Sequence, residues 1–176
     1  MIEKTFAIIK PEAIEQKLIG KIITRIEESG LQITKMDMII APYETVAKHY
    51  EKDDLWAEKV GNGNLRDYAK IGKDPVQEEG TNDPVKLGRL VQKRTIEHLA
   101  GKKVVIMELS GEDAVNRFRA LCGATEPASA APESIRGTYS KDDYITSLIQ
   151  KRPLLNLLHS SGNAEEAVIE LNLWFS

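Results

Sequence analysis

The sequence predicts an α+β fold in which helices pack on an antiparallel sheet of four strands. Three observations predict it. Four short apolar runs have the length of buried strands and are bounded by turn or charged residues. Stretches with the helical spacing of apolar residues separate the first run from the second and the third from the fourth. With short middle helices set aside, the order is βαββαβ, the ferredoxin-like arrangement, and we expect the helices on one face of the sheet.

The first half of the chain supplies two of these strands. Pro11 ends the first one, because it holds Lys10 in an extended conformation. Isoleucines at helical spacing followed by Gly30 indicate an amphipathic helix, and an alternation that slips once indicates a long strand with a β-bulge. The expected elements are a strand at 5–9, a helix at 19–29, a strand at 31–41 and a short helix at 44–51.

Residues 52–83 are the least patterned part of the chain, and we interpret them as an insertion. One short helix is expected near 55–60. The stretch 61–63 is interpreted as a turn, because its two glycines follow no strand and lack the remainder of a dinucleotide-binding motif.

The second half repeats the pattern with clearer end signals. Pro84 is well placed to begin a helix with Leu87, Leu90 and Val91 facing inward. The stretch 110–113 reads as a capping box for the next helix, which ends at Gly123. The expected elements are a helix at 84–99, a strand at 104–109, a helix at 112–121, an ordered loop at 124–134, a short helix at 142–150, a strand at 154–158 and a helix at 164–175.

Length and composition predict a single soluble domain. The 176 residues suffice for one core and are too few for two ordinary domains. The net charge of −3 argues against a nucleic-acid surface, and Cys122, as the single cysteine, excludes an internal disulfide. Because no apolar run reaches membrane-spanning length and the start resembles no signal peptide, we expect a cytoplasmic protein without membrane contact.

His159 is the first candidate for chemistry, because it stands where the last strand leads into the last helix. A helix N-terminus favours anions, although a lone histidine is more often a core residue. Glu170, at the border of the apolar stripe of that helix, is either half-solvated or reaches the imidazole and fixes its tautomer. Ser161 is close enough in sequence to orient either one. A joint role of Asn156 and His159 requires a twisted or broken strand end.

Four polar groups from separate elements could converge on a polyphosphate. Guanidinium groups bind phosphate oxygens bidentately, although each of these residues taken alone is more often solvated or in a surface ion pair. No cluster of cysteine, histidine or acidic residues has metal-ligand spacing, so a divalent ion would arrive with substrate phosphates. The four are Lys10, Arg119, Thr125 and Arg136.

Taken in order, these motifs resemble those of the nucleoside diphosphate kinase family over nearly the whole chain. The resemblance implies a ping-pong reaction. The imidazole of His159 takes the γ-phosphate of a nucleoside triphosphate, with ATP as the expected donor, and passes it to a nucleoside diphosphate. It also implies a homo-oligomer built from dimers. The matching segments are residues 5–12, 20–23, 30–31, 49–50, 122–127, 135–137, 156–161 and 165–175.

The resemblance assigns a role to each candidate residue by its position. Mg²⁺ carried by the substrate would help to neutralise the phosphates. Asn156 would bind the ribose hydroxyl side, Tyr50 and Lys10 would lie beside the transferred group, and Glu170 and Ser161 would orient His159. The residues expected to hold the phosphates are Lys10, Arg119, Thr125 and Arg136.

The chain departs from the family pattern in four places. Insertions are expected at about 52–84 and 140–153 within a single domain of residues 1–176. The position of the base-stacking aromatic falls on Val91, with Leu90 or Leu87 as alternatives. After His159 the usual Gly-Ser-Asp becomes Ser-Ser-Gly, which removes a carboxylate that would help to hold the metal's water shell. With its end at Ser176, we expect the family's C-terminal extension and its subunit contacts to be missing.

Two classes of function are therefore compared. The first is the active kinase, since every residue at a chemical position is present. The second is a nucleotide-binding regulatory module of the same fold with little turnover, motivated by the insertion and the missing aspartate. Labelling of His159 by a γ-labelled triphosphate selects the first, and tight binding without phosphate exchange selects the second.

Overall fold

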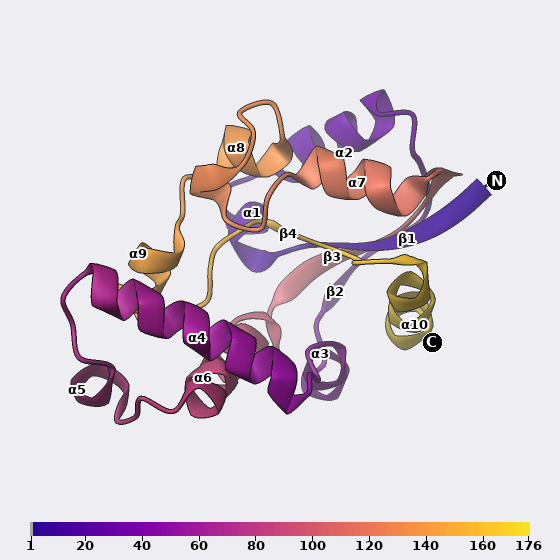
Figure 1. The fold of residues 1–176 in the computed structure, drawn as a ribbon. Helices are drawn as coiled ribbons and strands as arrows, with labels where there is room; N and C mark the ends of the chain where they lie inside the picture. Colours follow the sequence, from indigo (N-terminus) through magenta and orange to yellow (C-terminus); the bar gives the residue numbers. More distant parts are fainter. Residues whose placement is uncertain (1) are drawn as a thin grey trace.

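The computed structural model describes residues 2–176, and within them four strands form one antiparallel sheet in the order β2-β3-β1-β4 (Figure 1). Strand β1 lies in the centre, with Ile9 opposite Val105 of β3 on one side and Ile8 opposite His159 of β4 on the other. The α+β, ferredoxin-like sheet predicted from the sequence is confirmed. The strands are β1 (Ile2–Ile9), β2 (Gln32–Ile40), β3 (Lys103–Glu112) and β4 (Leu158–Ser160).

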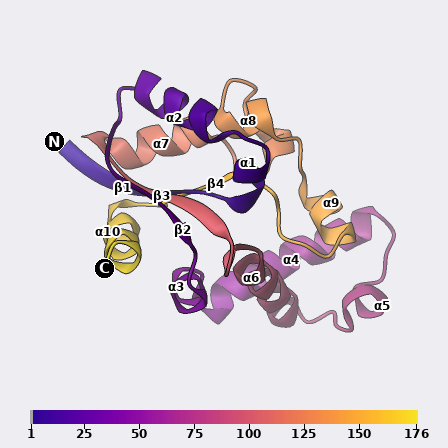
Figure 2. The same ribbon diagram turned by 180° about the vertical axis from the view of Figure 1, so that it is seen from behind.

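Helices cover both faces of this sheet, so the expectation of helices on one face was wrong. Figures 1 and 2 place α2 and α7 on one side and α3 and α10 on the other. The reason lies in β1, where Phe6 and Ile8 point to one face, Ala7 and Ile9 to the other, and none is exposed. The helices are α1 (Pro11–Glu15), α2 (Ile19–Glu28), α3 (Tyr43–His49), α4 (Asp54–Lys70), α5 (Pro75–Glu79), α6 (Pro84–Leu99), α7 (Ala114–Cys122), α8 (Ile135–Tyr139), α9 (Tyr144–Ile149) and α10 (Ala164–Trp174), with a 3₁₀ turn at Pro127–Ser129.

Helix α4 is the largest departure from the sequence prediction. It runs without a break through Gly61-Asn62-Gly63, which was interpreted as a turn, and far beyond the short helix expected at 55–60. Tertiary packing overrides the low helix propensity of glycine here. A Cβ at Gly61 would overlap the carbonyl oxygen of Pro84, and a Cβ at Gly88 would overlap that of Ala57. The two glycines therefore let α4 and α6 approach closely.

The predicted capping box at 110–113 was also wrong. Strand β3 continues through Ser110, because the start of β1 pairs with it as far as Ile2 opposite Glu112. Asp113 then stands at the N-cap of α7 in a left-handed conformation, without a side-chain cap bond. The N–H of Val115 donates instead to Glu3 Oε2 of β1 over 3.0 Å. The free donor of the helix is thus satisfied by a neighbouring strand, which local spacing could not reveal.

Several other expectations were confirmed. The bulge in the second strand falls between Ile33 and Lys35, and Gly30 ends α2 with a positive φ. The expected strand at 154–158 was wrong in position, since β4 spans Leu158–Ser160: Leu157 has φ +69° and pairing with β1 begins only at Leu158. Within the described residues no helix combines the length and the apolar character that crossing a membrane requires.

The contact between α4 and α6 predicts opposite effects for two glycine substitutions. Gly88→Ala should lower the free energy of unfolding by about 1–3 kcal/mol, because the new methyl group meets the backbone of α4. Gly63→Ala is the matched control on α4, since its nearest neighbour is the flexible end of Arg66 at 3.8 Å. It should raise the free energy by roughly 0.5–1 kcal/mol. Urea unfolding of both variants checks this; equal stability of the two would contradict the packing described.

Candidate active site

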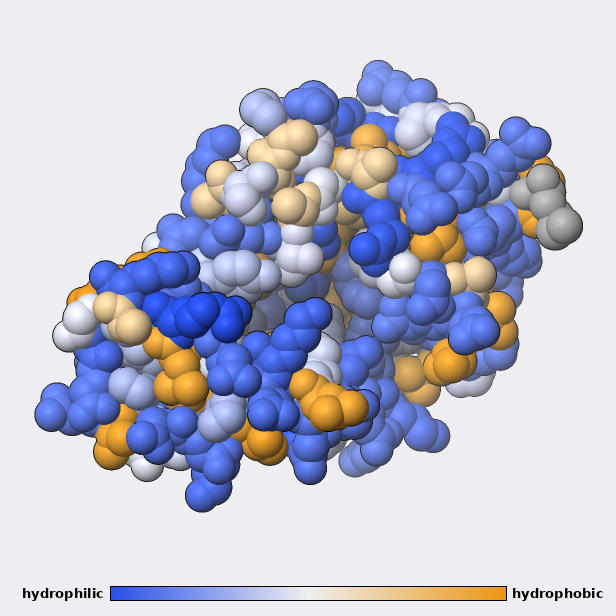
Figure 3. Space-filling view, viewed as in Figure 1, coloured by the Kyte–Doolittle hydropathy of each residue, from blue (hydrophilic) through white to orange (hydrophobic). Residues whose placement is uncertain are grey.

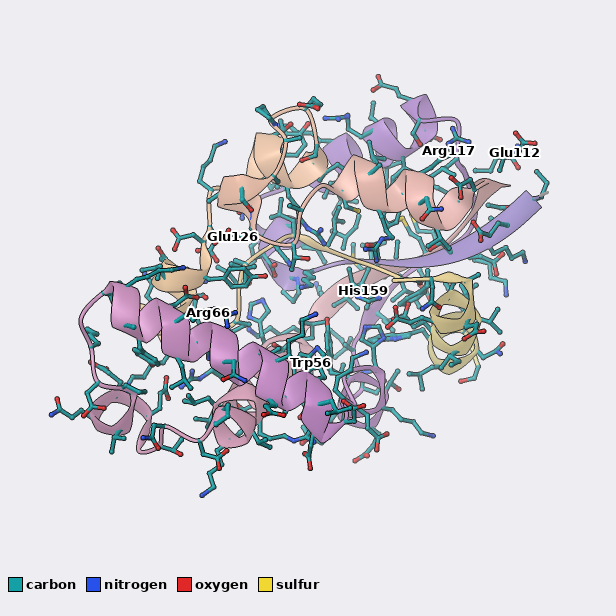
Figure 4. All side chains as sticks on the ribbon, in the orientation of Figure 1. Trp56, Arg66, Glu112, Arg117, Glu126 and His159 are labelled. Carbon is teal, nitrogen blue, oxygen red and sulfur yellow. The ribbon has the colours of Figure 1, made fainter. Side chains whose placement is uncertain are left out.

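A cleft of about 470 Å³ opens between the end of the sheet and the pair α4–α6 (Figure 3). Figure 4 shows His159 in the middle of this cleft, and Trp56 of α4 lines the same cleft. Two predicted residues, Ser161 and Glu170, lie behind His159 rather than on the cleft wall. The structure brings the other predicted residues together on that wall: Lys10, Tyr50, Val91, Arg119, Thr125, Arg136, Asn156 and His159.

A left-handed residue, Leu157, interrupts the extended backbone, and this lets Asn156 and His159 face the same cleft. The left-handed conformation of Leu157 supplies the broken strand end that a joint role requires. Backbone bonds hold this residue, since Lys10 N–H donates to its carbonyl over 2.9 Å and its own N–H donates to Glu12 Oε1 over 3.0 Å. Conformations of this kind cost on the order of 1 kcal/mol or more in non-glycine residues and persist where the surroundings determine them.

Lys10 and Asn156 form the polar floor of the cleft. Lys10 Nζ donates to Asn156 Oδ1 over 2.6 Å, and Asn156 Nδ2 donates to the Thr125 carbonyl over 3.1 Å. Burial, assisted by Arg136, lowers the pKa of Lys10 to about 8, although Glu12 opposes the shift. At neutral pH Lys10 is therefore still mostly charged and poorly solvated, which favours an anionic ligand.

Arg136 stabilises the backbone around the cleft as well as offering N–H groups to a ligand. It was expected to bind phosphate, but three of its nitrogens donate to main-chain carbonyls: those of Gly123 at 2.7 Å, Leu158 at 2.9 Å and Asn156 at 3.1 Å. A guanidinium carries five N–H groups, so two remain. Arg119 differs, since it is exposed and its guanidinium forms no hydrogen bond or ion pair with any other described residue. All the N–H groups of Arg119 are therefore available to an anion.

His159 is held from behind by a carboxylate. Its Nε2 lies 2.8 Å from Glu170 Oε1, close enough for a hydrogen bond but out of line for one, so this nitrogen has no aligned partner among residues 2–176. Ser161 Oγ donates to Glu170 Oε2 over 2.6 Å. Since Nε2 faces Glu170, Nδ1 is the ring nitrogen left for a substrate.

The electrostatics of the cleft keep His159 neutral. Burial lowers its pKa to about 3, and Lys10 and Arg136 act in the same direction. Burial raises the pKa of Glu170 to about 7, against the opposing effect of His49 and Ser161. A neutral imidazole with one free nitrogen at neutral pH is a competent nucleophile.

His49 is the residue that sequence reasoning left undecided. It is buried against His159, with ring centroids 4.3 Å apart and planes at 79°, and its Nδ1 accepts from Trp174 Nε1 over 3.2 Å. Its only sequence signal is its place next to Tyr50, which cannot show what it packs against.

The side chains that could surround an aromatic ligand come largely from the two segments expected to be insertions. Val91 lines the cleft as expected. Trp56 and Val60 of α4 and Tyr144 of α9 line it as well. The sequence predicted short helices at 55–60 and 142–150, but no periodicity showed that these side chains face the cleft.

A metal ion has two conceivable positions. His49, His159 and Glu170 offer three donor atoms within 4.8 Å of one another, a set suited to a nitrogen-preferring ion rather than to Mg²⁺. No carboxylate from residues 2–176 lines the cleft itself. The cleft wall itself therefore provides no anionic side chain for an ion.

Comparisons with known proteins agree on one family. The family model for nucleoside diphosphate kinase matches residues 3–56 and 86–176. A nucleoside diphosphate kinase of Pyrobaculum aerophilum is 37% identical over 99% of this chain and 95% of its own length, and one of Pyrococcus furiosus is 32% identical over 99% and 83%.

Solved structures give the same result. The crystal structure of an NDP kinase from Pyrobaculum aerophilum matches with a TM-score of 0.95 and 35% identity, over 100% of this chain and 97% of that one. A transition-state mimic of the Borrelia burgdorferi enzyme, with bound vanadate and ADP, matches with a TM-score of 0.79 and 27% identity over 100% and 88%.

Replacement of Arg136 or of Arg119 by lysine should have different consequences, because only Arg136 donates to main-chain carbonyls. Arg136→Lys should lower the free energy of unfolding by about 3 kcal/mol, because lysine can replace only one of three bonds to carbonyls, each worth roughly 1.5 kcal/mol. Arg119→Lys should change it by less than about 0.5 kcal/mol and weaken the binding of a nucleoside diphosphate. Chemical unfolding and nucleotide titration measure both; a stable Arg136→Lys variant would show that these bonds are dispensable.

Proposed function

This chain belongs to the nucleoside diphosphate kinase family, and we propose that it transfers the γ-phosphate of a nucleoside triphosphate through a phosphohistidine at His159. The observation that carries the proposal is the state of His159. It is half-buried and neutral, with Nε2 toward Glu170 and the cations Lys10 and Arg119 around the same cleft. Phosphoryl transfer needs little more than such positioning and charge stabilisation.

The reaction has two symmetrical halves. The lone pair of His159 Nδ1 attacks the γ-phosphorus, an N–P bond forms, and the bond to the β-phosphate oxygen breaks with its electrons left on the departing diphosphate. In the second half a β-phosphate oxygen of another diphosphate attacks the phosphorus, and the N–P bond breaks. The proton on Nε2 stays on the ring, because the carboxylate of Glu170, with Oε1 at 2.8 Å, stabilises the positive character that the ring gains.

The remaining residues would position the substrate. Arg119, unpaired and exposed, would contact the phosphates first, and Lys10 would neutralise the transferred group together with the N–H groups that Arg136 has left. Thr125 would add a hydroxyl contact to the phosphates. Tyr50, on the wall beside His49, would flank the transferred group, and Asn156 would bind the ribose hydroxyl side.

Mg²⁺ is the divalent ion that we propose for the reaction. Bound to the phosphates it would neutralise their charge, and the cleft wall would reach it only through water, since its polar residues are cations, amides and hydroxyls. This fits the Ser160-Ser161-Gly162 sequence, which offers no carboxylate after the histidine.

Further features of the protein follow from the same proposal. ATP would be the usual donor, and a cleft that grips phosphate and ribose favours a broad range of bases. A dimer is supported by β2, an edge strand that exposes Met36, Met38 and Ile40. We propose larger assemblies built from that dimer, a cytoplasmic location, and one domain of residues 1–176 with insertions at about 52–84 and 140–153.

Covalent labelling tests the proposal directly. Incubation with γ-labelled ATP and Mg²⁺, without acceptor, should leave acid-labile phosphate on the wild type and none on His159→Gln. His98→Gln is the matched control and should leave labelling intact, because His98 lies outside the cleft and a glutamine amide can still donate to its partner Glu12. A wild type that binds nucleotide tightly but takes up no label would overturn the proposal in favour of a regulatory nucleotide-binding module.

The pH dependence of kcat/KM should report Lys10 on its alkaline side. A cation whose pKa is lowered to about 8 is charged below that pH and neutral above it, so kcat/KM should fall roughly tenfold per pH unit above about 8. The substrate phosphates are already fully ionised there, since their last pKa lies near ~6–7. Steady-state kinetics between about pH 6 and 10 measure this; a flat profile up to about pH 10 would show that Lys10 does not carry the effect.

A further inference from the structure

A pair of buried side chains behind the cleft has no role in the mechanism so far. We propose that Trp174 and His49 are positioning residues: the indole N–H of Trp174 fixes the tautomer of His49, and this reserves Glu170 Oε1 for His159. The inference rests on the proposed function, because it concerns the histidine that would carry the phosphate. It adds two residues that never touch the substrate.

The geometry places two imidazoles in competition for one carboxylate oxygen. Glu170 Oε1 lies 2.8 Å from His159 Nε2 and 3.5 Å from His49 Nδ1, and the other oxygen of Glu170 already accepts from Ser161. If His49 carried its proton on Nδ1, it could donate to Oε1 and draw the carboxylate away from His159. The tautomer of His49 therefore decides whether Glu170 Oε1 stays oriented toward His159.

Trp174 determines which nitrogen of His49 carries the proton. An indole N–H can only donate, and it reaches His49 Nδ1 at 3.2 Å, so this nitrogen must carry a lone pair. A neutral imidazole then has its proton on Nε2. His49 thus presents an acceptor to Glu170 Oε1 and cannot donate to it. Of the two imidazoles, only His159 can give a proton to this oxygen.

Burial of His49 and Trp174 keeps water from changing the tautomer of His49. His49 and Trp174 are 8% and 6% exposed, and both pack on the ring of Phe6, with centroids 6.1 Å and 5.8 Å away. Burial also lowers the pKa of His49, with His159 and Lys52 acting in the same direction and Glu170 opposing them, so the ring stays neutral. Because water has little access, protein groups determine the tautomer.

The consequence is a fixed direction for three donors: Trp174 donates to His49, Ser161 donates to Glu170, and Nε2 of His159 faces Glu170 at 2.8 Å. Nδ1 of His159 remains as the free lone pair. The same argument explains why a tryptophan, rather than a phenylalanine of similar shape, suits this core position.

The first experiment reads the tautomers without any substitution. In the wild-type protein labelled with ¹⁵N-histidine, nitrogen NMR should show His49 neutral with its proton on Nε2 and Nδ1 unprotonated. A proton on Nδ1 of His49 would overturn the inference. The measurement does not depend on turnover, so it separates this inference from the proposed function, which fails only if no phosphate reaches His159.

The second experiment removes the donor alone. In Trp174→Phe, His49 should become a mixture of tautomers, and the rate of His159 phosphorylation by ATP should fall about tenfold, while the affinity for ADP stays unchanged. Adding His49→Phe, which removes the competing N–H, should restore most of the rate. Rescue in the double variant supports the inference, since further erosion of the core cannot repair a structural defect. A double variant no faster than Trp174→Phe would overturn it.

Discussion

The contact between His159 and Glu170 is the interaction on which the site depends. A carboxylate buried to this degree is costly unless other groups satisfy it, and here Ser161 donates to one oxygen while His159 Nε2 lies 2.8 Å from the other. The contact turns Nε2 of His159 inward and leaves Nδ1 for the cleft. Because burial also keeps the ring neutral, one arrangement supplies both the orientation and the reactivity of the nucleophile.

The second constraint is the broken strand in front of His159. Only a left-handed residue at Leu157 brings Asn156 and His159 to the same wall, and the fold holds it with Arg136, Glu12 and the backbone of Lys10. Residues expected to bind phosphate thus spend part of their hydrogen bonds on the backbone. The site is rigid because its ligand groups and its scaffold are the same side chains.

The parts of this account that depend on local pattern were predictable from the sequence. Strand β1 with Lys10 at its end, the last helix with Glu170 on its border, and the shared cleft of His159 with the cations followed from periodicity and family motifs. Helix α4 did not, because its glycines signal a turn locally and reveal their purpose only against α6. The cap of α7 by Glu3 and the bond from Trp174 to His49 likewise join residues more than 100 positions apart.

The central claim is that Glu170 fixes which nitrogen of His159 takes the phosphate. Phosphorus–nitrogen correlation NMR of the ¹⁵N-histidine-labelled phosphoenzyme measures this directly. The account predicts coupling of phosphorus to Nδ1, with Nε2 still protonated and facing Glu170. Coupling of phosphorus to Nε2 would mean that the imidazole ring of His159 flips before it reacts. That result would contradict the account.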